Sequence, residues 1–494
     1  MEYSRLGTVL KRYSFDEKMR IAQDYSQKTI NSEGMIGTNK WTNEAFPWEL
    51  ETFVLFAVNA IEYDNKDFKG KNVRKFIEII NCIREEIPVY MKTMDGKDRE
   101  MWFLTTTASV QFDIQEYYPF KMFRFSYLFT YVSSKIDMKK IFKDTFGCDY
   151  ASYCLLGEML WLGNEKGVFS QSLINSILEK LRIPFSHLVI TRQAYIESLS
   201  KITTDPIDYL YCLRPSYTYP FIESEGKIYC PLPHLFCRAT TSSLMHRLTD
   251  GDAELRAKIG KEVYEGYLYT IINESGIFDE VISEKTYKHK KMERRTVDVM
   301  TRVGQSYVFF DSKSFSPKTA IRTFSAEALE QDIERLAESL AQVYKHIFMK
   351  FPNEYNYFES DVSSHVEIYG LVVVQEEAYI IGNAIYEKTA EILGVPVNSE
   401  EYVRLCTHVG VVSIYNVERY CFTKTDMLQS LRAIRDGREI TSSWLTGQTA
   451  KDITYKRYLD FNEQLINDMK SVLGLGILTF DSNVILANDI AKVR

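Results

Sequence analysis

Between residues 240 and 415, segments with a helical pattern alternate with short segments rich in β-branched and aromatic residues. Helical segments show apolar residues every three or four positions, whereas strand segments are short apolar runs bounded by turn residues. This alternation favours an α/β domain, in which helices cover the faces of a sheet. The sequence predicts helices near 252–274, 325–349 and 384–394, and strands near 277–287, 295–302, 306–313, 366–375 and 408–415.

The segments before and after this region have mainly helical patterns. Pro47 suits the first turn of a helix, because its missing N–H has no partner to lose there. A further apolar stripe begins at Val73 and is expected to stop at Pro88. The length of 494 residues suits about three domains.

Prolines and aromatic residues become dense around residue 214 and indicate a hairpin that leads into a new domain. We therefore expect a mainly helical domain over 1–213, an α/β domain with a mixed sheet flanked by helices over 214–420, and a helical C-terminal extension over 421–494.

Composition excludes several classes of protein. The chain is 45% hydrophobic and 26% charged, as in globular proteins, and its formal charge of -7 argues against a surface that binds nucleic acid all over. The eight cysteines and seven histidines lack the spacing of zinc sites, and the usual nucleotide-binding and serine-hydrolase motifs are absent. Without any run of about 18 apolar residues, the chain is expected to be cytoplasmic and to make no contact with a membrane.

The segment RRTVDVMTRVGQSYVFFDSKSF, residues 294–315, predicts a hairpin with chemistry at its open end. A glycine at the first central position suits a two-residue type II′ turn, so Gly304 places Val303 opposite Ser306. That register places Asp298 opposite Asp311 and, since side chains alternate between faces, Lys313 on the same face.

Two aspartates facing each other at about 5 Å repel one another, and a fold needs a reason to keep them. A Mg²⁺ ion supplies one, because it binds carboxylate oxygens together with water and phosphate oxygens. Lys313 beside Asp298 and Asp311 would suit metal-assisted phosphodiester hydrolysis. The alternative is a solvent-exposed hairpin in which Asp298 and Lys313 form an ordinary surface ion pair.

These residues resemble the PD-(D/E)XK nuclease superfamily. Its core has a helix with an acidic residue, an Asp on one strand, D/E-x-K on the next, and then a helix and further strands. Asp298 matches the isolated acid and Asp311-Ser312-Lys313 the tripeptide, over a region of about 240–415. The resemblance implies a restriction-endonuclease-like fold that binds Mg²⁺ or Mn²⁺ through Asp298, Asp311 and the Ser312 carbonyl, with Lys313 positioning the attacking water.

The resemblance also implies an acidic residue on the helix KIGKEVYEGYLYTII, which would bind a water or a second ion. Glu265 is the first choice. Glu262 is its substitute, because residues three apart share a face of an α-helix.

Basic residues before the hairpin are candidates for substrate binding. Residues 284–295 carry six Lys or Arg against two Glu, which suits contacts with phosphates. The alternative is an edge strand protected by lysines. Gln342 lies off the apolar stripe of the following helix and is a further candidate. The substrate-binding candidates are Lys288, Lys290, Lys291, Arg294, Arg295 and Gln342.

We therefore expect a Mg²⁺-dependent endonuclease that acts on nucleic acid, DNA more than RNA, in the manner of bacterial restriction or phage-defence effectors. The alternative is a catalytically silent nuclease-like fold that serves as a nucleic-acid-binding or protein-interaction scaffold. The N-terminal helical domain would regulate the enzyme, select its substrate, or bind a partner or a second copy of the chain.

Overall fold

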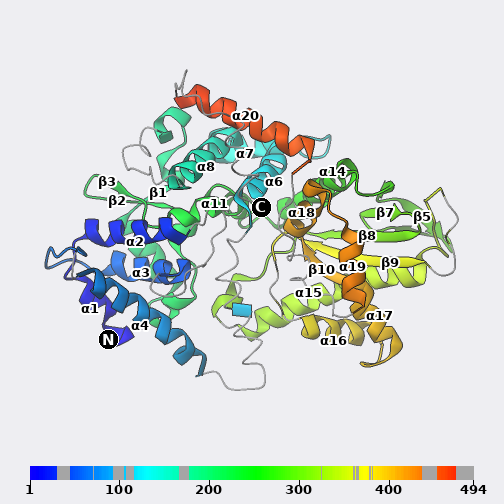
Figure 1. Cartoon of the computed structure of the whole chain (residues 1–494), viewed down its shortest axis with the longest axis horizontal. Coiled ribbons are helices and arrows are strands. Elements are labelled where there is room, and N and C mark those ends of the chain that lie inside the picture. The colour runs from blue at the N-terminus through cyan, green and yellow to red at the C-terminus, as the bar shows by residue number, and fades with distance from the viewer. Residues whose placement is uncertain are drawn as a thin grey trace. The chain divides into compact units, whose positions relative to one another are not determined.

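The computed structural model describes residues 1–29, 45–69, 72–92, 105–106, 116–165, 177–323, 325–359, 362, 366–377, 380, 382–436 and 453–473. They form two compact units (Figure 1). The first comprises the described residues of Met1–Val132 and Asp137–Asp250 together with 463–473, and the second comprises Ser133–Ile136 and the described residues of Gly251–Asn462. In the part of the chain that the structure describes, none of the helices combines the length and apolar character of a membrane span.

The second unit is built on a five-stranded mixed sheet with the strand order β10-β9-β8-β7-β4. β4, β7 and β8 are antiparallel neighbours, whereas β8, β9 and β10 run parallel. The mixed α/β class predicted for this region is therefore confirmed. The strands are β4 (Glu280–Ser283), β7 (Val299–Val303), β8 (Ser306–Lys313), β9 (Glu367–Val374) and β10 (Val409–Ser413).

Helices cover both faces of this sheet. α15 (Ala326–Lys345) crosses over from β8 to β9 and packs on β8, β9 and β10, with α16 (Gly382–Leu393) against it. α14 (Glu265–Ser275) packs against β4 and against α18 (Ile414–Thr423). In Figure 1, α15 lies below the strands and α14 above them. This arrangement brings the polar side of α15 and the start of α14 toward the end of β8 that carries the predicted site.

Several predicted elements differ in detail. The helix predicted over 252–274 is α13 (Ala253–Lys258), a π-helical segment η7 (Ile259–Tyr264) and α14. The predicted strands 277–287 and 295–302 are each interrupted, because β5 (Thr286–His289) and β6 (Met292–Arg295) pair only with each other. The chain therefore leaves the main sheet after β4 and rejoins it at β7. The helix α17 (Glu400–His408) was not predicted.

The first unit is mainly helical, as predicted, and also contains a small sheet. Pro47 is the first residue of α3 (Pro47–Asn59), which is buried along most of its length. α4 (Val73–Lys92) continues past Pro88, where it was expected to stop, because its buried apolar stripe keeps it packed against α3 despite the lost hydrogen bond. The other main helices are α1 (Leu6–Leu10), α2 (Phe15–Thr29), α6 (Tyr118–Thr130), α7 (Met138–Phe146), α8 (Tyr150–Glu165), α10 (Arg192–Ile202), α11 (Phe236–Ala239) and α12 (Ser242–Leu248).

The units divide the chain at places other than the predicted boundaries of 213/214 and 420/421. β2 (Phe221–Ser224) and β3 (Lys227–Tyr229) form the hairpin expected near residue 214, but β2 pairs in parallel with β1 (Val189–Thr191). The hairpin therefore belongs to the first unit, which continues to Asp250. After residue 420, α19 (Met427–Arg435) belongs to the second unit, and α20 (Lys456–Leu473) extends into the first.

Candidate active site

The β7–β8 hairpin has the predicted register. Val303 pairs with Ser306, and Gly304 between them has a φ of +57°, which a type II′ turn requires at this position. The paired residues end one position short of the two aspartates: Asp298 directly precedes β7, and Asp311 lies within β8. The hairpin thus carries both carboxylates at its open end.

Asp298 is fixed against the neighbouring strand although it lies outside the ladder. The backbone N–H of Ser312 donates a hydrogen bond of 2.6 Å to Oδ2 of Asp298. This bond replaces the missing strand pairing and holds the Asp298 carboxylate beside the tripeptide Asp311-Ser312-Lys313.

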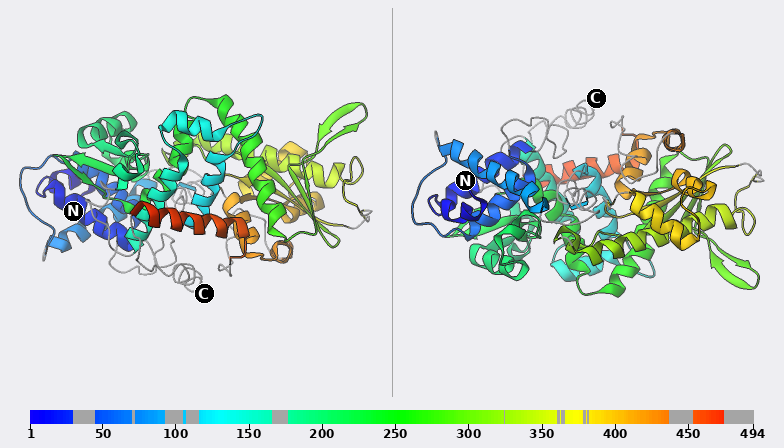
Figure 2. Two further views of the ribbon diagram at one scale, coloured as in Figure 1. Left: turned by 90° about the horizontal axis from the view of Figure 1, so that it is seen from above. Right: turned by 90° about the horizontal axis from the view of Figure 1, so that it is seen from below.

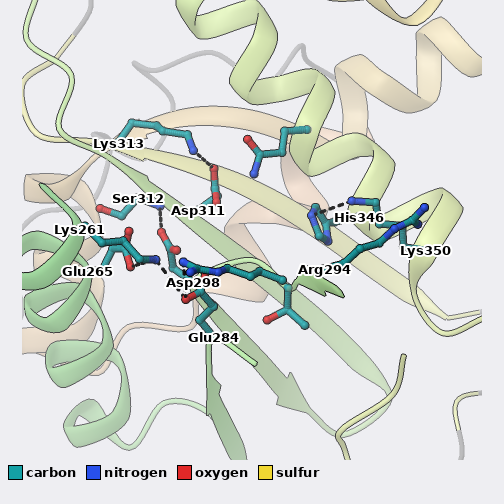
Figure 3. Close-up of a pocket in the computed structure, with 13 residues that line it drawn as sticks. Lys261, Glu265, Glu284, Arg294, Asp298, Asp311, Ser312, Lys313, His346 and Lys350 are labelled. Carbon is teal, nitrogen blue, oxygen red and sulfur yellow. Dashed lines mark hydrogen bonds and ion pairs between the residues drawn. The ribbon is translucent and has the colours of Figure 1, made fainter. Parts of the chain in front are cut away.

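A cavity of about 520 Å³ collects most of the predicted site residues. Figure 3 shows Asp298 and Asp311 near its centre, with Glu265 and Lys261 on one side and His346 and Lys350 on the other. Eight of the predicted residues line this cavity: Glu265, Arg294, Arg295, Asp298, Asp311, Ser312, Lys313 and Gln342. Glu262, Lys288, Lys290 and Lys291 are not among its lining residues.

Burial dominates the electrostatics of the two aspartates. Asp298 is 8% exposed and Asp311 is 3% exposed. Burial raises the pKa of Asp298 well above its usual range, the negative charges of Asp311 and Glu265 raise it further, and the Ser312 N–H and Lys261 oppose the shift. Burial also raises the pKa of Asp311, against the lowering effect of Lys313. Burial therefore disfavours the charged form of both carboxylates, and an added cation would favour that form.

Lys313 forms an ion pair with Asp311 rather than with Asp298. Its Nζ lies 2.6 Å from Oδ2 of Asp311, and the two side chains are 31% and 4% exposed. The alternative of a solvent-exposed pair between Asp298 and Lys313 therefore does not describe this hairpin.

Glu265 also reaches the cavity, whereas its substitute does not. Lys261 Nζ contacts Glu265 Oε2 at 2.6 Å and Glu284 Oε2 at 3.1 Å. Burial raises the pKa of Glu265, Lys261 counters that effect, and the charges of Glu284 and Asp311 add to it. Glu262 instead pairs with Lys135 at 2.9 Å. Because the backbone is π-helical over 259–264, residues three apart no longer share a face, which explains why Glu262 is not a substitute.

The π-helical segment η9 (His346–Lys350), which directly follows α15, contributes two cavity residues that sequence reasoning missed. His346 and Lys350 follow Gln342 at intervals of four, so a helical repeat of polar residues was the available signal. Lys350 Nζ and the Tyr355 hydroxyl each lie 3.1 Å from a ring nitrogen of the buried His346. Burial, with the charge of Lys350, lowers the pKa of His346 to about 3, so its imidazole is neutral at neutral pH. Lys261 and Glu284 were missed as well, and Lys261 could have been found four residues before Glu265.

The predicted substrate-binding residues fall into two groups. Arg294 and Arg295 line the cavity and form ion pairs with Glu354 at 2.7 Å and with Glu284 at 3.7 Å. Lys288, Lys290 and Lys291 are exposed on the β5–β6 hairpin, beyond the cavity. Gln342 is exposed and lines the cavity from α15.

Metal binding at this site would need ligands from outside the chain. Among the described residues, no three His, Cys, Asp or Glu side chains are grouped closely enough to hold a metal ion by themselves. Mg²⁺ is commonly bound by one or two carboxylates and completes its shell with water and phosphate oxygens. Asp298 and Asp311 are two buried carboxylates beside each other, and Asp298 accepts its hydrogen bond from a backbone N–H, so the pair fits that requirement.

Comparison of the chain with models of protein families, with curated proteins and with solved structures gave no match.

Proposed function

We propose that the second unit is a nuclease domain of the PD-(D/E)XK type, with a restriction-endonuclease-like fold and a requirement for Mg²⁺ or Mn²⁺. The observation that carries the proposal is the pair of buried aspartates at the open end of the β7–β8 hairpin, with Lys313 two residues after the second. The reaction is hydrolysis of a phosphodiester bond of DNA: a water oxygen bonds to phosphorus as the bond to the leaving oxygen breaks.

Each residue has a role that its position supports. Asp298, Asp311 and the carbonyl oxygen of Ser312 would hold the cation, which when bound supplies Lewis-acid activation of water and phosphate. Lys313 orients the attacking water and stabilises the negative charge that develops on the phosphate. Glu265 would bind a further water or a second ion.

The charges of the cavity support this assignment. Without a cation, Lys313 neutralises Asp311 and Lys261 is shared between Glu265 and Glu284, while Asp298 accepts a hydrogen bond from the uncharged Ser312 N–H. A divalent ion would supply the missing positive charge and release Lys313 toward the substrate. Arg294, Arg295 and Lys350 line the cavity as further cations and suit contacts with substrate phosphates.

Cleavage of supercoiled plasmid, single-stranded DNA and RNA with Mg²⁺ or Mn²⁺ tests the proposal. We expect Asp311→Ala and Lys313→Ala to lower the rate by at least about 100-fold, because each removes a group that acts in the transition state. Asp436→Ala and Lys258→Ala replace exposed residues of the same kinds outside the cavity and serve as matched controls. Undiminished cleavage by both site variants would refute the assignment.

The second candidate is a catalytically silent nuclease-like scaffold. The ion pairs of Asp311 with Lys313 and of Glu265 with Lys261 favour it, because they neutralise part of the site without any metal. Isothermal titration with Mn²⁺ separates the two candidates. An enzyme should bind Mn²⁺ and lose that binding in Asp298→Asn, whereas no binding, or equal binding by the variant, supports the scaffold.

The first unit is proposed to regulate the nuclease or to bind a partner or a second copy of the chain. Light scattering on the purified chain, with and without DNA, would reveal self-association. A monomer under both conditions would exclude a second copy of the chain as the partner, so that the first unit would regulate the nuclease or bind a different partner.

A further inference from the structure

A two-stranded ribbon stands out from the second unit beside the candidate site. β5 (Thr286–His289) and β6 (Met292–Arg295) pair antiparallel with each other and with no strand of the main sheet. Figure 2 shows this ribbon, in green, projecting away from the five-stranded sheet. In the part of the chain that the structure describes, neither edge of the ribbon pairs with a further strand.

The tip of the ribbon is made of two lysines in an unfavourable backbone conformation. Lys290 and Lys291 have φ values of 47° and 67°, and positive φ at both central residues defines a type I′ turn. Such turns strongly prefer Asn-Gly, because Cβ comes too close to the following carbonyl oxygen in the left-handed region, which Gly avoids and Asn tolerates. Both lysines are exposed, as is Lys288 on β5. The chain thus accepts backbone strain to place positive charge at the tip, which points to a function of the charge.

The base of the ribbon is fastened to the wall of the cavity. Glu354 accepts hydrogen bonds of 2.7 and 2.9 Å from Arg294 and one of 3.1 Å from the Tyr287 hydroxyl. The Tyr287 ring packs on Tyr355 with a centroid distance of 4.8 Å. These contacts hold the ribbon in one direction relative to the site.

Geometry limits what the ribbon can reach. Arg295 lines the cavity at one end of β6, and Lys291 directly precedes the other end, four residues before Arg295. At a strand rise of about 3.3 Å per residue, the tip lies roughly 13 Å from the cavity wall. This reach exceeds the depth of the major groove of B-form DNA, about 8.5 Å, and the groove's width of about 12 Å admits a two-stranded β-ribbon. The major groove of A-form RNA is too narrow and deep for it.

We propose that the β5–β6 ribbon occupies the major groove of duplex DNA next to the bond held in the cavity, with its lysines on the flanking phosphates. This inference rests on the proposed nuclease function and narrows its substrate to B-form duplex DNA.

The variant Lys290→Asn/Lys291→Gly tests the inference without damaging the fold, since it installs the residue pair that the turn prefers. Binding is measured by fluorescence anisotropy across a range of salt concentrations, in EDTA so that the nucleic acid stays intact. The probes are a labelled DNA duplex of about 20 base pairs, which is about two helical turns, the corresponding single strand and an RNA duplex of equal length. Lys139→Gln/Lys140→Gln, two exposed lysines of α7, removes the same charge elsewhere.

We expect the turn variant to bind duplex DNA about 10-fold more weakly than the wild type. The slope of log affinity against log salt concentration should become shallower by about 0.9 for each lost phosphate contact. The single strand, the RNA duplex and the control variant should change little. Equal losses for all three probes would overturn the groove assignment, as would an unchanged affinity for duplex DNA or no binding of duplex DNA by the wild type.

Cleavage by the same wild-type preparation with Mn²⁺ separates the two proposals. If the wild type cleaves DNA and the turn variant binds duplex DNA as tightly as the wild type does, the ribbon assignment alone is overturned. No cleavage, together with weaker duplex binding by the turn variant, overturns the nuclease function and supports the ribbon as a DNA-binding element.

Discussion

Buried carboxylates determine the chemistry of the candidate site residue by residue. Asp311 and Glu265 each face a lysine, whereas Asp298 accepts a hydrogen bond from a backbone N–H. A backbone hydrogen bond stabilises a carboxylate less than a full positive charge does, and Asp311 and Glu265 add repulsion. Asp298 is therefore the carboxylate that a bound cation would stabilise most.

Removing the charge of Asp298 should stabilise the metal-free protein. Asp298→Asn keeps an oxygen that accepts the Ser312 N–H but ends the repulsion from Asp311, so we expect the free energy of unfolding to rise by about 0.5–2 kcal/mol near neutral pH. Urea denaturation in EDTA measures this change. Added Mn²⁺ should reverse the order, because only the wild type keeps both ligands. A variant that is less stable than the wild type in EDTA would contradict this account of the site.

His346 should make stability depend on pH. Its pKa is lowered to about 3 by burial, whereas an unfolded histidine has a pKa of about 6.5. As the pH falls below about 6.5, the unfolded chain takes up a proton that the folded chain refuses, so the free energy of unfolding falls. Between about pH 6.5 and 5 we expect a loss of roughly 1–2 kcal/mol from this residue.

His346→Gln should lack that part of the loss in urea denaturation across the same pH range. His246→Gln, which removes an imidazole from the first unit, is the control. Identical pH dependences for His346→Gln and the wild type would mean that His346 titrates normally in the folded protein.

At the scale of elements, the sequence was most informative where one local rule decides the structure. Gly304 and the two-residue period of strands determined the β7–β8 register, and with it the meeting of Asp298 and Asp311. The π-helical segment η7, which turns Glu262 away, has no such signal, because it depends on how the helix packs. The separation of β5 and β6 from the main sheet also depends on tertiary structure. From the sequence alone, β4 with β5 and β6 with β7 could equally form two long, continuous strands that pair with each other.

The close packing of α15 on β9 should be essential to the site. Gly370 on β9 lies beneath Val343 and Ile347, and a Cβ atom at this position would collide with Val343. We expect Gly370→Ala to lower the free energy of unfolding by about 1–3 kcal/mol, because a tightly packed helix must shift to make room. Since Gln342 and His346 are carried by that helix region, the shift should also weaken cleavage or metal binding.

Urea denaturation measures the change in stability caused by Gly370→Ala. Gly7→Ala is the matched control, since the nearest atom to its new Cβ is Phe56 Cδ1 at 3.9 Å. If Gly370→Ala proved as stable as the wild type, α15 would not be held as closely to β9 as the structure shows.

At the scale of the whole molecule, average charge conceals local charge. A formal charge of -7 argues against nucleic acid as a partner of the entire surface, yet Lys288, Lys290 and Lys291 are exposed together on one ribbon. The number of compact parts was also hard to predict, because the β2–β3 hairpin looks like a boundary in the sequence while its pairing with β1 is a long-range contact. Contact with nucleic acid should accordingly be confined to one strip of the second unit.

The first unit depends on a buried ionic network of its own. Glu51 Oε2 lies 2.8 Å from Arg214 Nε and accepts a hydrogen bond of 2.9 Å from the Tyr217 hydroxyl, and His234 lies 3.3 Å from its other oxygen. Burial alone would raise the pKa of Glu51, but His234 and Arg214 outweigh it and hold the pKa below its usual range. We expect Glu51→Gln to destabilise the first unit by about 3–5 kcal/mol, because it removes the negative charge that faces the buried Arg214.

Hydrogen exchange, read by mass spectrometry, localises the effect of Glu51→Gln. Exchange should accelerate in α3 of the first unit and remain slow in β8 of the second, because each unit has its own core. Glu197→Ala, an exposed glutamate of α10, should change neither segment. Equal acceleration in α3 and β8 would show that the two units unfold as one, in which case a lesion in the first unit would disable the candidate site as well.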